Sequence, residues 1–482
     1  MISRAVLIGI LAVFTAAGRV CAQQPGTATG QRARWVADEV IVKFRQTKPK
    51  QEIDRICRKH GGNVFYTSPF AGFRRIKLPA GLLPQQAVER FRNEPAVEYA
   101  ERNFYAYAFA FPNDPYYSSV QWNFHVAAGV NAPGAWQITT GDPSVIIAVL
   151  DTGAAYQNYN NFILAPDLAG TLFVPGYDFV NNDSHPNDDN GHGTHVTGTI
   201  AQTTNNAIGA AGIAFGCSIM PVKVLNKRGE ALYSDIANGI YYAADHGAKV
   251  INMSLGGTAD STTLRDAVAY AYNNGVTIVC AAGNEYEEGN PTTYPAGYND
   301  YCIAVGATRY DLARAHYSNT GSWLDLAAPG GDLDVDQNGD GYKDGIVQQT
   351  FGSNPSDMGY WLYEGTSMAT PHVSAAAGLI ASIGIISPDA IRQALEQTAR
   401  DLGAAGRDDQ FGYGLIDIHA ALKYFASRGD YNADGATDAA DLERFMQSWL
   451  DNDPVVDVAP NGGDGIVNIE DFAVFAANWS GA

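Results

Sequence analysis

The segment SVIIAVLD (residues 144–151) is a short, continuously apolar run that ends in an aspartate. Four similar runs follow along the chain: CSIMPVKVL (217–225), AKVINMSL (248–255), VTIVCAAGN (276–284) and CIAVGA (302–307). Segments with helical periodicity separate these runs. Fully apolar strands that alternate with helices are typical of a parallel sheet that is buried on both faces. We therefore expect residues 111–427 to form a doubly wound, mostly parallel α/β domain.

Two of these runs end in polar side chains. Asp151 closes the first run and Asn284 closes the fourth. Because ligands bind beyond the carboxyl ends of the strands in such sheets, both side chains are expected at one functional edge. An aspartate at a strand end is also a common turn residue or helix cap, so Asp151 alone does not indicate catalysis.

The stretch NGHGTHVTGT (190–199) places His192 and His195 three residues apart. On a helix such residues share a face, so three interpretations remain open: a metal-binding pair, a catalytic base beside a bystander, or two core histidines. The helical zinc-protease signature has histidines four apart with a glutamate between them, and this stretch has neither feature. The metal interpretation is therefore the least favoured.

A third motif, GTSMATPH (365–372), precedes the apolar segment VSAAAGLIASIG. Ser367 in this motif is either a helix N-cap or a nucleophile. With Asp151 and His192, it gives an aspartate, a histidine and a serine in the chain order of subtilisin. Together the motifs make the chain resemble the subtilisin-like serine proteases, and thermitase-like members in particular, over nearly all of residues 112–425.

The resemblance implies a role for each of these side chains. Ser367 would attack the scissile carbonyl, and His192 would take its proton and return it to the leaving amine. Asp151 would hold the imidazole in the required tautomer, Asn284 would donate to the oxyanion, and His195 would be structural. The implied substrates are proteins and peptides, bound as an extended strand along a backbone edge. This edge comprises Ser254, Leu255 and Gly256.

Residues 23–110 are expected to form a separate N-terminal unit. Strand-like and helical patterns alternate between EVIVKF (39–44) and PAVEYAE (95–101), which predicts a small α+β fold of the ferredoxin-like type. Residues 31–105 have a net charge of +7 from 15 basic and 8 acidic side chains, whereas residues 106–427 have a net charge of −20 from 12 and 32. Opposite charges favour association. The unit resembles the family's inhibitory propeptides, which implies that it covers the cleft and that the enzyme removes it.

Residues 1–22 have a basic Arg4, an apolar run and a small-residue end, a pattern typical of a secretory signal peptide. A membrane anchor is the alternative. No other stretch approaches the ~18–20 apolar residues that cross a bilayer. We therefore expect a secreted protein, extracellular or attached to the cell surface, with no membrane association after signal removal.

The overall charge of −20 argues against nucleic acid as a partner and favours cations. The five cysteines are too few and too scattered for a disulfide framework. Cys280 and Cys302 are expected as small buried side chains, with a bridge between them as the alternative.

Calcium takes several oxygen ligands, which an acidic exported protein can supply. The resemblance implies two calcium sites. The first comprises Asp114, Asp167 and Asn206. The second comprises Asp178, Asp183 and Asn187, with His185 where a small oxygen-bearing residue is expected. A further loop, with a merely solvated acidic turn as its alternative, has oxygen-bearing side chains at Asp336, Asn338, Asp340 and Asp344.

Residues 428–482 are expected to form a separate module. Its first loop has the spacing of an EF-hand, with a glycine at the sixth position. The oxygen-bearing residues are Asp430, Asn432, Asp434, Asp438 and Asp441. With the helical segment DLERFMQSWL that follows, the tail resembles a dockerin, which implies Ca²⁺ and a cohesin-like partner. The second half of the tail (459–479) departs from this pattern, because it lacks oxygen-bearing side chains at the first and third loop positions.

Two other functional classes remain open. A non-catalytic peptide-binding protein would use the tail for assembly. An esterase would need a G-x-S-x-G elbow, and the sequence around Ser367 lacks the second glycine. The intact set of four catalytic residue types favours a secreted, calcium-stabilised serine endopeptidase that is made as a self-processing precursor.

Overall fold

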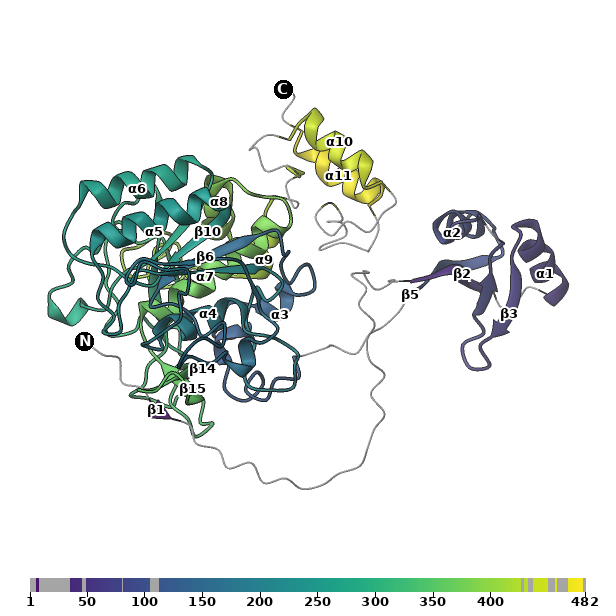
Figure 1. Cartoon of the computed structure of the whole chain (residues 1–482). Coiled ribbons are helices and arrows are strands. Elements are labelled where there is room, and N and C mark those ends of the chain that lie inside the picture. Colours follow the sequence, from purple (N-terminus) through teal and green to yellow (C-terminus); the bar gives the residue numbers. More distant parts are fainter. Residues whose placement is uncertain are drawn as a thin grey trace, which may run out of the picture. The chain divides into compact units, whose positions relative to one another are not determined.

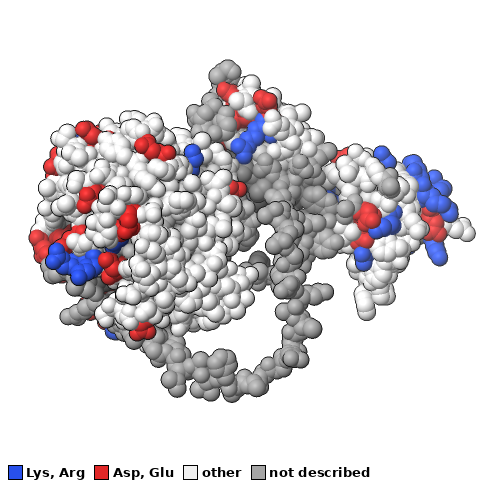
Figure 2. Space-filling view, viewed as in Figure 1, with Lys and Arg blue, Asp and Glu red and all other residues white. Residues whose placement is uncertain are grey.

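The structure is a computed structural model. It describes residues 6–7, 35–45, 49–79, 81–104, 112–425, 429–431, 437–449, 456 and 467–479. The contacts divide the chain into two compact units, Ala12–Ala110 and Met1–Leu11 with Phe111–Ala482. Figure 1 shows their elements, and Figure 2 shows Lys and Arg side chains clustered on the N-terminal unit. No helix among the described residues is long and apolar enough to cross a membrane.

The N-terminal unit has the strand and helix order βαββαβ. Its elements are β2 (Trp35–Phe44), α1 (Lys50–Lys59), β3 (Asn63–Thr67), β4 (Arg74–Lys77), α2 (Pro84–Arg92) and β5 (Val97–Phe104). The strands pair antiparallel in the order β3-β4-β2-β5. Alternate residues of β2, among them Val40 and Val42, pack against the buried faces of both helices. A ferredoxin-like α+β unit is therefore present, as the sequence predicts.

The larger unit is built on a parallel sheet of eight strands. They are β6 (Ile146–Asp151), β7 (Leu172–Phe173), β8 (Tyr177–Asp178), β9 (Ser218–Lys223), β10 (Ala248–Met253), β11 (Thr277–Ala281), β12 (Cys302–Thr308) and β13 (Leu326–Pro329). The order is β13-β12-β11-β10-β6-β9-β7, with β8 also paired to β9, and every pairing is parallel. The prediction of a mostly parallel α/β sheet is confirmed.

Helices cover both faces of this sheet, as Figure 1 shows. In β6, Ile147 and Val149 belong to the core on one face, whereas Ala148 and Leu150 belong to the core on the other. α4 (His192–Ala201), α7 (Thr366–Ser382), α8 (Pro388–Thr398), α9 (Ile418–Leu422) and the short α3 (Ala132–Ala135) pack with the first core. α5 (Tyr233–Asp245) and α6 (Thr262–Asn273) pack with the second core. Single 3-10 turns lie at Trp122–Phe124, Pro166–Leu168 and Tyr286–Glu288.

A separate antiparallel hairpin precedes α7. It consists of β14 (Ile346–Phe351) and β15 (Met358–Tyr363), and the two-residue strand β1 (Val6–Leu7) pairs with β15. The four cysteines of the described residues, Cys57, Cys217, Cys280 and Cys302, are free and buried. Of the two alternatives for Cys280 and Cys302, the structure therefore shows buried thiols.

The described part of the tail contains two helices, α10 (Ala439–Gln447) and α11 (Ile469–Ala477). They enclose a small aromatic core in which Tyr431, Phe445 and Phe475 stack with ring centroids about 6 Å apart. Much of both loops lies outside the described residues, so the EF-hand-like assignment stays a prediction.

Candidate active site

Asp151 and His192 are joined by a hydrogen bond at the carboxyl edge of the parallel sheet. Asp151 is the last residue of β6 and is fully buried, and His192 is the first residue of α4. His192 Nδ1 lies 2.8 Å from Asp151 Oδ1, and a quarter of the histidine side chain is exposed. The other ring nitrogen is thus free to act on a substrate-side group.

Glycines on both sides of His192 permit this close approach. Gly191 has a φ of 104°, which favours glycine, and sits at the N-cap of α4. A Cβ at Gly193 would collide with Gly153 O and lie 3.0 Å from Asp151 Oδ1. The G-H-G sequence therefore lets the first turn of α4 rest directly on the loop that follows Asp151.

The surroundings of His192 favour its protonated form. Burial alone lowers the pKa of the imidazole, but the adjacent Asp151 carboxylate outweighs this effect, and Asp188 adds to it. The net result is a raised pKa. A base with such a partner can hold the proton that it takes during attack.

Ser367 lies in the first turn of α7. Its Oγ donates to Ser254 O at 3.2 Å rather than to His192, and Ser254 Oγ donates in return to Ser367 O at 2.8 Å. Catalytic hydrogen bonds are often unformed without substrate. Since Ser254 follows β10, the neighbour of β6, the serine is held at the same sheet edge as Asp151.

Asn284 is positioned by the residue before Ser367. Its Oδ1 accepts hydrogen bonds of 2.9 Å from both Thr366 N and Thr366 Oγ1. A Cβ placed on Gly365 would lie 3.4 Å from Asn284 Nδ2 and 3.7 Å from Ser367 N. One side-chain amide nitrogen and one backbone nitrogen from a helix N-terminus therefore lie close to each other beside Gly365.

Two protein-family models match the chain. A protein-family model described as the subtilase family matches residues 142–414. The chain belongs to the subtilase family. A second model, the fervidolysin N-terminal prodomain, matches residues 22–103.

Individual relatives and a solved structure extend the match. A thermophilic serine proteinase from Bacillus sp. (strain AK1) is 39% identical over 396 residues, 82% of this subtilase and 89% of that protein. Thermitase from Thermoactinomyces vulgaris is 41% identical over 314 residues, 65% of this chain and 99% of thermitase. A solved protease structure from Pseudoalteromonas arctica is 34% identical with a TM-score of 0.55, covering 65% of this chain and 99% of that one. The chain is a subtilisin-like serine endopeptidase with an N-terminal prodomain.

The predicted substrate edge of the subtilase lies beside Ser367. Ser254 forms two hydrogen bonds with Ser367: its hydroxyl donates to Ser367 O, and its carbonyl accepts from Ser367 Oγ. Leu255 and Gly256 make no backbone hydrogen bond to another described residue, whereas Gly257 pairs in both directions with Tyr294. The backbone groups of Leu255 and Gly256 are therefore available to an added strand.

The two other histidines named by the motifs have different surroundings from His192. His195 is fully buried, with Nε2 2.9 Å from Ile346 O and its ring stacked on Tyr363. Burial lowers the pKa of His195 to about 3. His372 is also buried and contacts Asn123, and burial lowers its pKa to about 4. Both stay neutral at ordinary pH, which agrees with structural roles.

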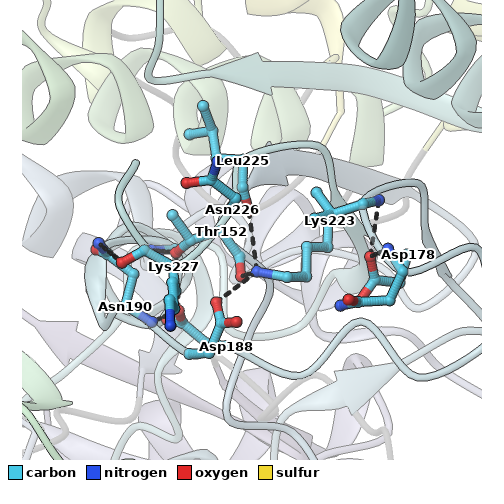
Figure 3. Close-up of polar contacts among 12 residues, drawn as sticks. Thr152, Asp178, Asp188, Asn190, Lys223, Leu225, Asn226 and Lys227 are labelled. Carbon is cyan, nitrogen blue, oxygen red and sulfur yellow. Dashed lines mark hydrogen bonds and ion pairs between the residues drawn. The ribbon is translucent and has the colours of Figure 1, made fainter. Parts of the chain in front are cut away.

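Three supporting residues were not identified from the sequence: Thr152, Asp188 and Lys223. Thr152 follows Asp151, and its N donates to Asp151 Oδ1 at 2.7 Å. Figure 3 shows the side chain of Lys223 reaching toward Thr152 and Leu225. A lysine within the otherwise apolar run CSIMPVKVL was the available signal, because a charge in a buried strand needs partners.

The residues predicted for the first calcium site come together. Asp114 accepts hydrogen bonds from Asn205 N and Asn206 N, and Asp167 Oδ1 accepts one from Asn206 Nδ2 at 2.7 Å. Both carboxylates are buried, and burial raises the pKa of Asp167.

The residues predicted for the second site are only partly gathered. Asp178 and Asp183 pair through their backbones. Asn187 Oδ1 instead accepts a hydrogen bond from Gln157 Nε2. The rings of His185 and Tyr159 stack with their centroids 3.8 Å apart. Among the described residues, no group of three or more His, Cys, Asp or Glu side chains is arranged to hold a metal ion.

In the tail, Asp438 and Asp441 form a reciprocal capping box at the start of α10. Asp430 is buried, whereas Asn432 and Asp434 lie outside the described residues. Asp438 and Asp441 thus have a helix-capping role, and the calcium role of the tail residues stays a prediction.

Proposed function

We propose that this subtilase is a secreted, self-processing, calcium-stabilised endopeptidase that cleaves peptide bonds with Ser367, His192 and Asp151. The 2.8 Å contact between His192 Nδ1 and Asp151 Oδ1 carries the proposal. It fixes the tautomer in which Nε2 can accept the Ser367 proton and later deliver it to the leaving amine. Nothing in the comparisons favours a non-catalytic peptide-binding protein.

The oxyanion of the tetrahedral intermediate would be held by Asn284 Nδ2 and Ser367 N. The orientation of Asn284 is set by its two hydrogen bonds from Thr366, so its amide nitrogen needs no rearrangement during the reaction. Such preorganised donors stabilise developing charge more than the ground-state carbonyl. The peptide backbone would pair with Ser254, Leu255 and Gly256, which makes recognition depend first on main chain.

The N-terminal region would act in two steps. Residues 1–22 would direct export, and residues 23–110 would cover the cleft until the enzyme cleaves the connection to residues 111–427. The basic character of the prodomain against the acidic catalytic domain supports this docking.

Calcium would stabilise loops of the catalytic domain and of the tail. Asp114 and Asp167 would offer two buried carboxylates to a hard cation, and the Asn206 amide, whose Nδ2 now donates to Asp167 Oδ1, would have to turn its oxygen toward the ion. Asp178 and Asp183 would contribute to a second site, in which Asn187 would have to leave Gln157. The tail (428–482) would bind calcium in its first loop and a cohesin-like partner through its helices. Calcium titrations of the full chain and of a chain that lacks residues 428–482, both followed by circular dichroism, test the tail. A calcium response of the tail appears as the difference between the two titrations.

Precursor processing tests the catalytic proposal directly. The Ser367→Ala precursor should stay uncut, while a Ser374→Ala control, with its hydroxyl removed inside the same helix, should still be cleaved. A fluorophosphonate label should modify the wild-type protein at Ser367 and lose this reaction on heating. Efficient processing of Ser367→Ala would refute the mechanism.

A further inference from the structure

Lys223 is a buried cation directly behind the catalytic aspartate. It is the last residue of β9, lies opposite Asp151 in the β6–β9 register, and is 1% exposed. Its ammonium donates to Thr152 O at 2.7 Å, Leu225 O at 2.9 Å and Asp189 Oδ1 at 2.6 Å. Because an ammonium has three donors, all of them are used. Figure 3 shows the Lys223 side chain beside Thr152 and Leu225.

Two of these three acceptors are backbone carbonyls, and one of them belongs to the residue after Asp151. Thr152 N donates to Asp151 Oδ1 at 2.7 Å, and the same oxygen lies 2.8 Å from His192 Nδ1. The Thr152 carbonyl lies in the peptide after the one that carries Thr152 N, so a bond that fixes this carbonyl restrains the Thr152 backbone next to the N–H that orients the catalytic carboxylate.

Asp188 contacts the side chain of Thr152. Thr152 Oγ1 donates to Asp188 Oδ1 at 2.8 Å and accepts from Gly193 N at 2.9 Å. Asp188 also accepts from Gly191 N and from Thr194 Oγ1 in the first turn of α4. Thr152 is thus fixed to the start of the histidine helix on one side and to Lys223 on the other.

We propose that Lys223 is a positioning residue for catalysis: its ammonium fixes the Thr152 carbonyl and so keeps the Asp151 carboxylate aligned with His192 Nδ1. Lys223 touches no reacting atom. The inference rests on the proposed roles of Asp151 and His192. Burying a lone ammonium is unfavourable unless it is fully paired, and here two of its partners are backbone carbonyls, one of them on the residue after Asp151.

A purely electrostatic role is the competing explanation. In that case Lys223 would only neutralise Asp189, and removal of both charges together would be harmless. If the carbonyl contacts matter, removing the charge of Asp189 cannot compensate for the loss of the ammonium. The double variant Lys223→Met/Asp189→Asn separates the two explanations.

The experiment compares kcat and KM on a peptide substrate, with active sites counted by fluorophosphonate. Lys223→Met should lower kcat about 10- to 100-fold with KM changed less than about twofold, since small misplacements of catalytic groups cost this much. Lys223→Arg, which keeps charge and donors, should recover part of the loss. Lys227→Met is the matched control, because Lys227 is exposed in the following turn and its side chain contacts none of these groups.

The outcomes separate this inference from the catalytic proposal. Wild-type hydrolysis together with an inert Ser367→Ala variant establishes the mechanism independently of Lys223. Restoration of kcat by the added Asp189→Asn change, or an unaltered kcat in Lys223→Met, would overturn the positioning role. If Lys223→Met does not fold, Asp189→Asn alone decides: kcat should stay within about twofold of wild type, and a tenfold loss would assign the effect to the ion pair.

Discussion

Asp188 and Thr152 share a buried hydrogen bond of 2.8 Å that joins the loop before His192 to the residue after Asp151. The Asp188 carboxylate therefore lies close to both members of the acid–base pair. Its negative charge is one of the causes that raise the pKa of His192. The groups that face His192 are Asp151, Asp188 and, one turn along α4, His195.

Asp188→Asn should shift the acid limb of kcat/KM to lower pH. The base must be neutral to take the serine proton, so activity is lost as the pH falls through the pKa of His192. Removing a nearby negative charge destabilises the imidazolium and lowers this pKa. Asp189→Asn is the control, and the acid limb of its kcat/KM profile should stay at the same pH as in the wild type. An unchanged or upward shift in Asp188→Asn would contradict the assignment.

Asn284→Ala should lower kcat with little change in KM. The reference magnitude is that of subtilisin, in which loss of this donor costs ~10²–10³ in kcat. Asn274→Ala removes the same amide from the exposed end of α6 and should have no such effect. If KM rose and kcat stayed constant, Asn284 would be a ground-state binding group instead.

The two histidines of the NGHGTH stretch should respond differently to truncation. His192→Ala should reduce kcat by about 10⁶, the magnitude known for subtilisin, in a protein that folds normally. His195→Ala should act through stability, with a loss of about 2–4 kcal/mol, because it removes a buried ring stacked on Tyr363 and a hydrogen bond to Ile346 O. Thermal unfolding and kcat per active site separate the two. A stable but inactive His195→Ala would contradict this division.

The main strands of the sheet could be predicted because each is a continuous apolar run. β14 could not, since its buried residues include Gln348 and Gln349. Gln348 donates to Ala211 O, and Gln349 accepts from Asp167 N. These partners come from distant parts of the chain, so a local pattern cannot reveal that the glutamines are inside. β3 has no strand-like pattern in the sequence either, because most of its side chains are exposed and it lacks apolar alternation.

The residues proposed as catalytic could be predicted from motifs, but the groups that hold them could not. Thr152, Asp188 and Lys223 are linked by contacts between separate segments of the chain, and their residue types are common in turns and on surfaces. The position of Ser367 Oγ on Ser254 O is likewise set by the packing of α7 against β10. The sequence motifs therefore predict the side chains proposed to react, but not the residues that contact them.

The effect of an Asp344 substitution on Tm should change sign between calcium-free and calcium-containing solution, which tests whether calcium binds there. Asp344 is 1% exposed, and its Oδ1 has no hydrogen-bond partner, while Oδ2 accepts from Gln337 N at 2.6 Å. Burial, together with the nearby Asp336 and Asp340, raises its pKa above the usual range. At neutral pH the ionised carboxylate is therefore unfavourable in the folded protein unless a cation accompanies it.

Asp344→Asn should consequently raise Tm in EDTA and lower it in calcium, each relative to the parent protein. The Ser367→Ala background prevents self-digestion during the scan. Asp300→Asn, which removes one exposed charge elsewhere, should change Tm little in either condition. Differential scanning calorimetry with and without calcium measures all three proteins. An equal decrease of Tm in both conditions would mean that residues 336–344 form an acidic turn held by its own hydrogen bonds, without a cation.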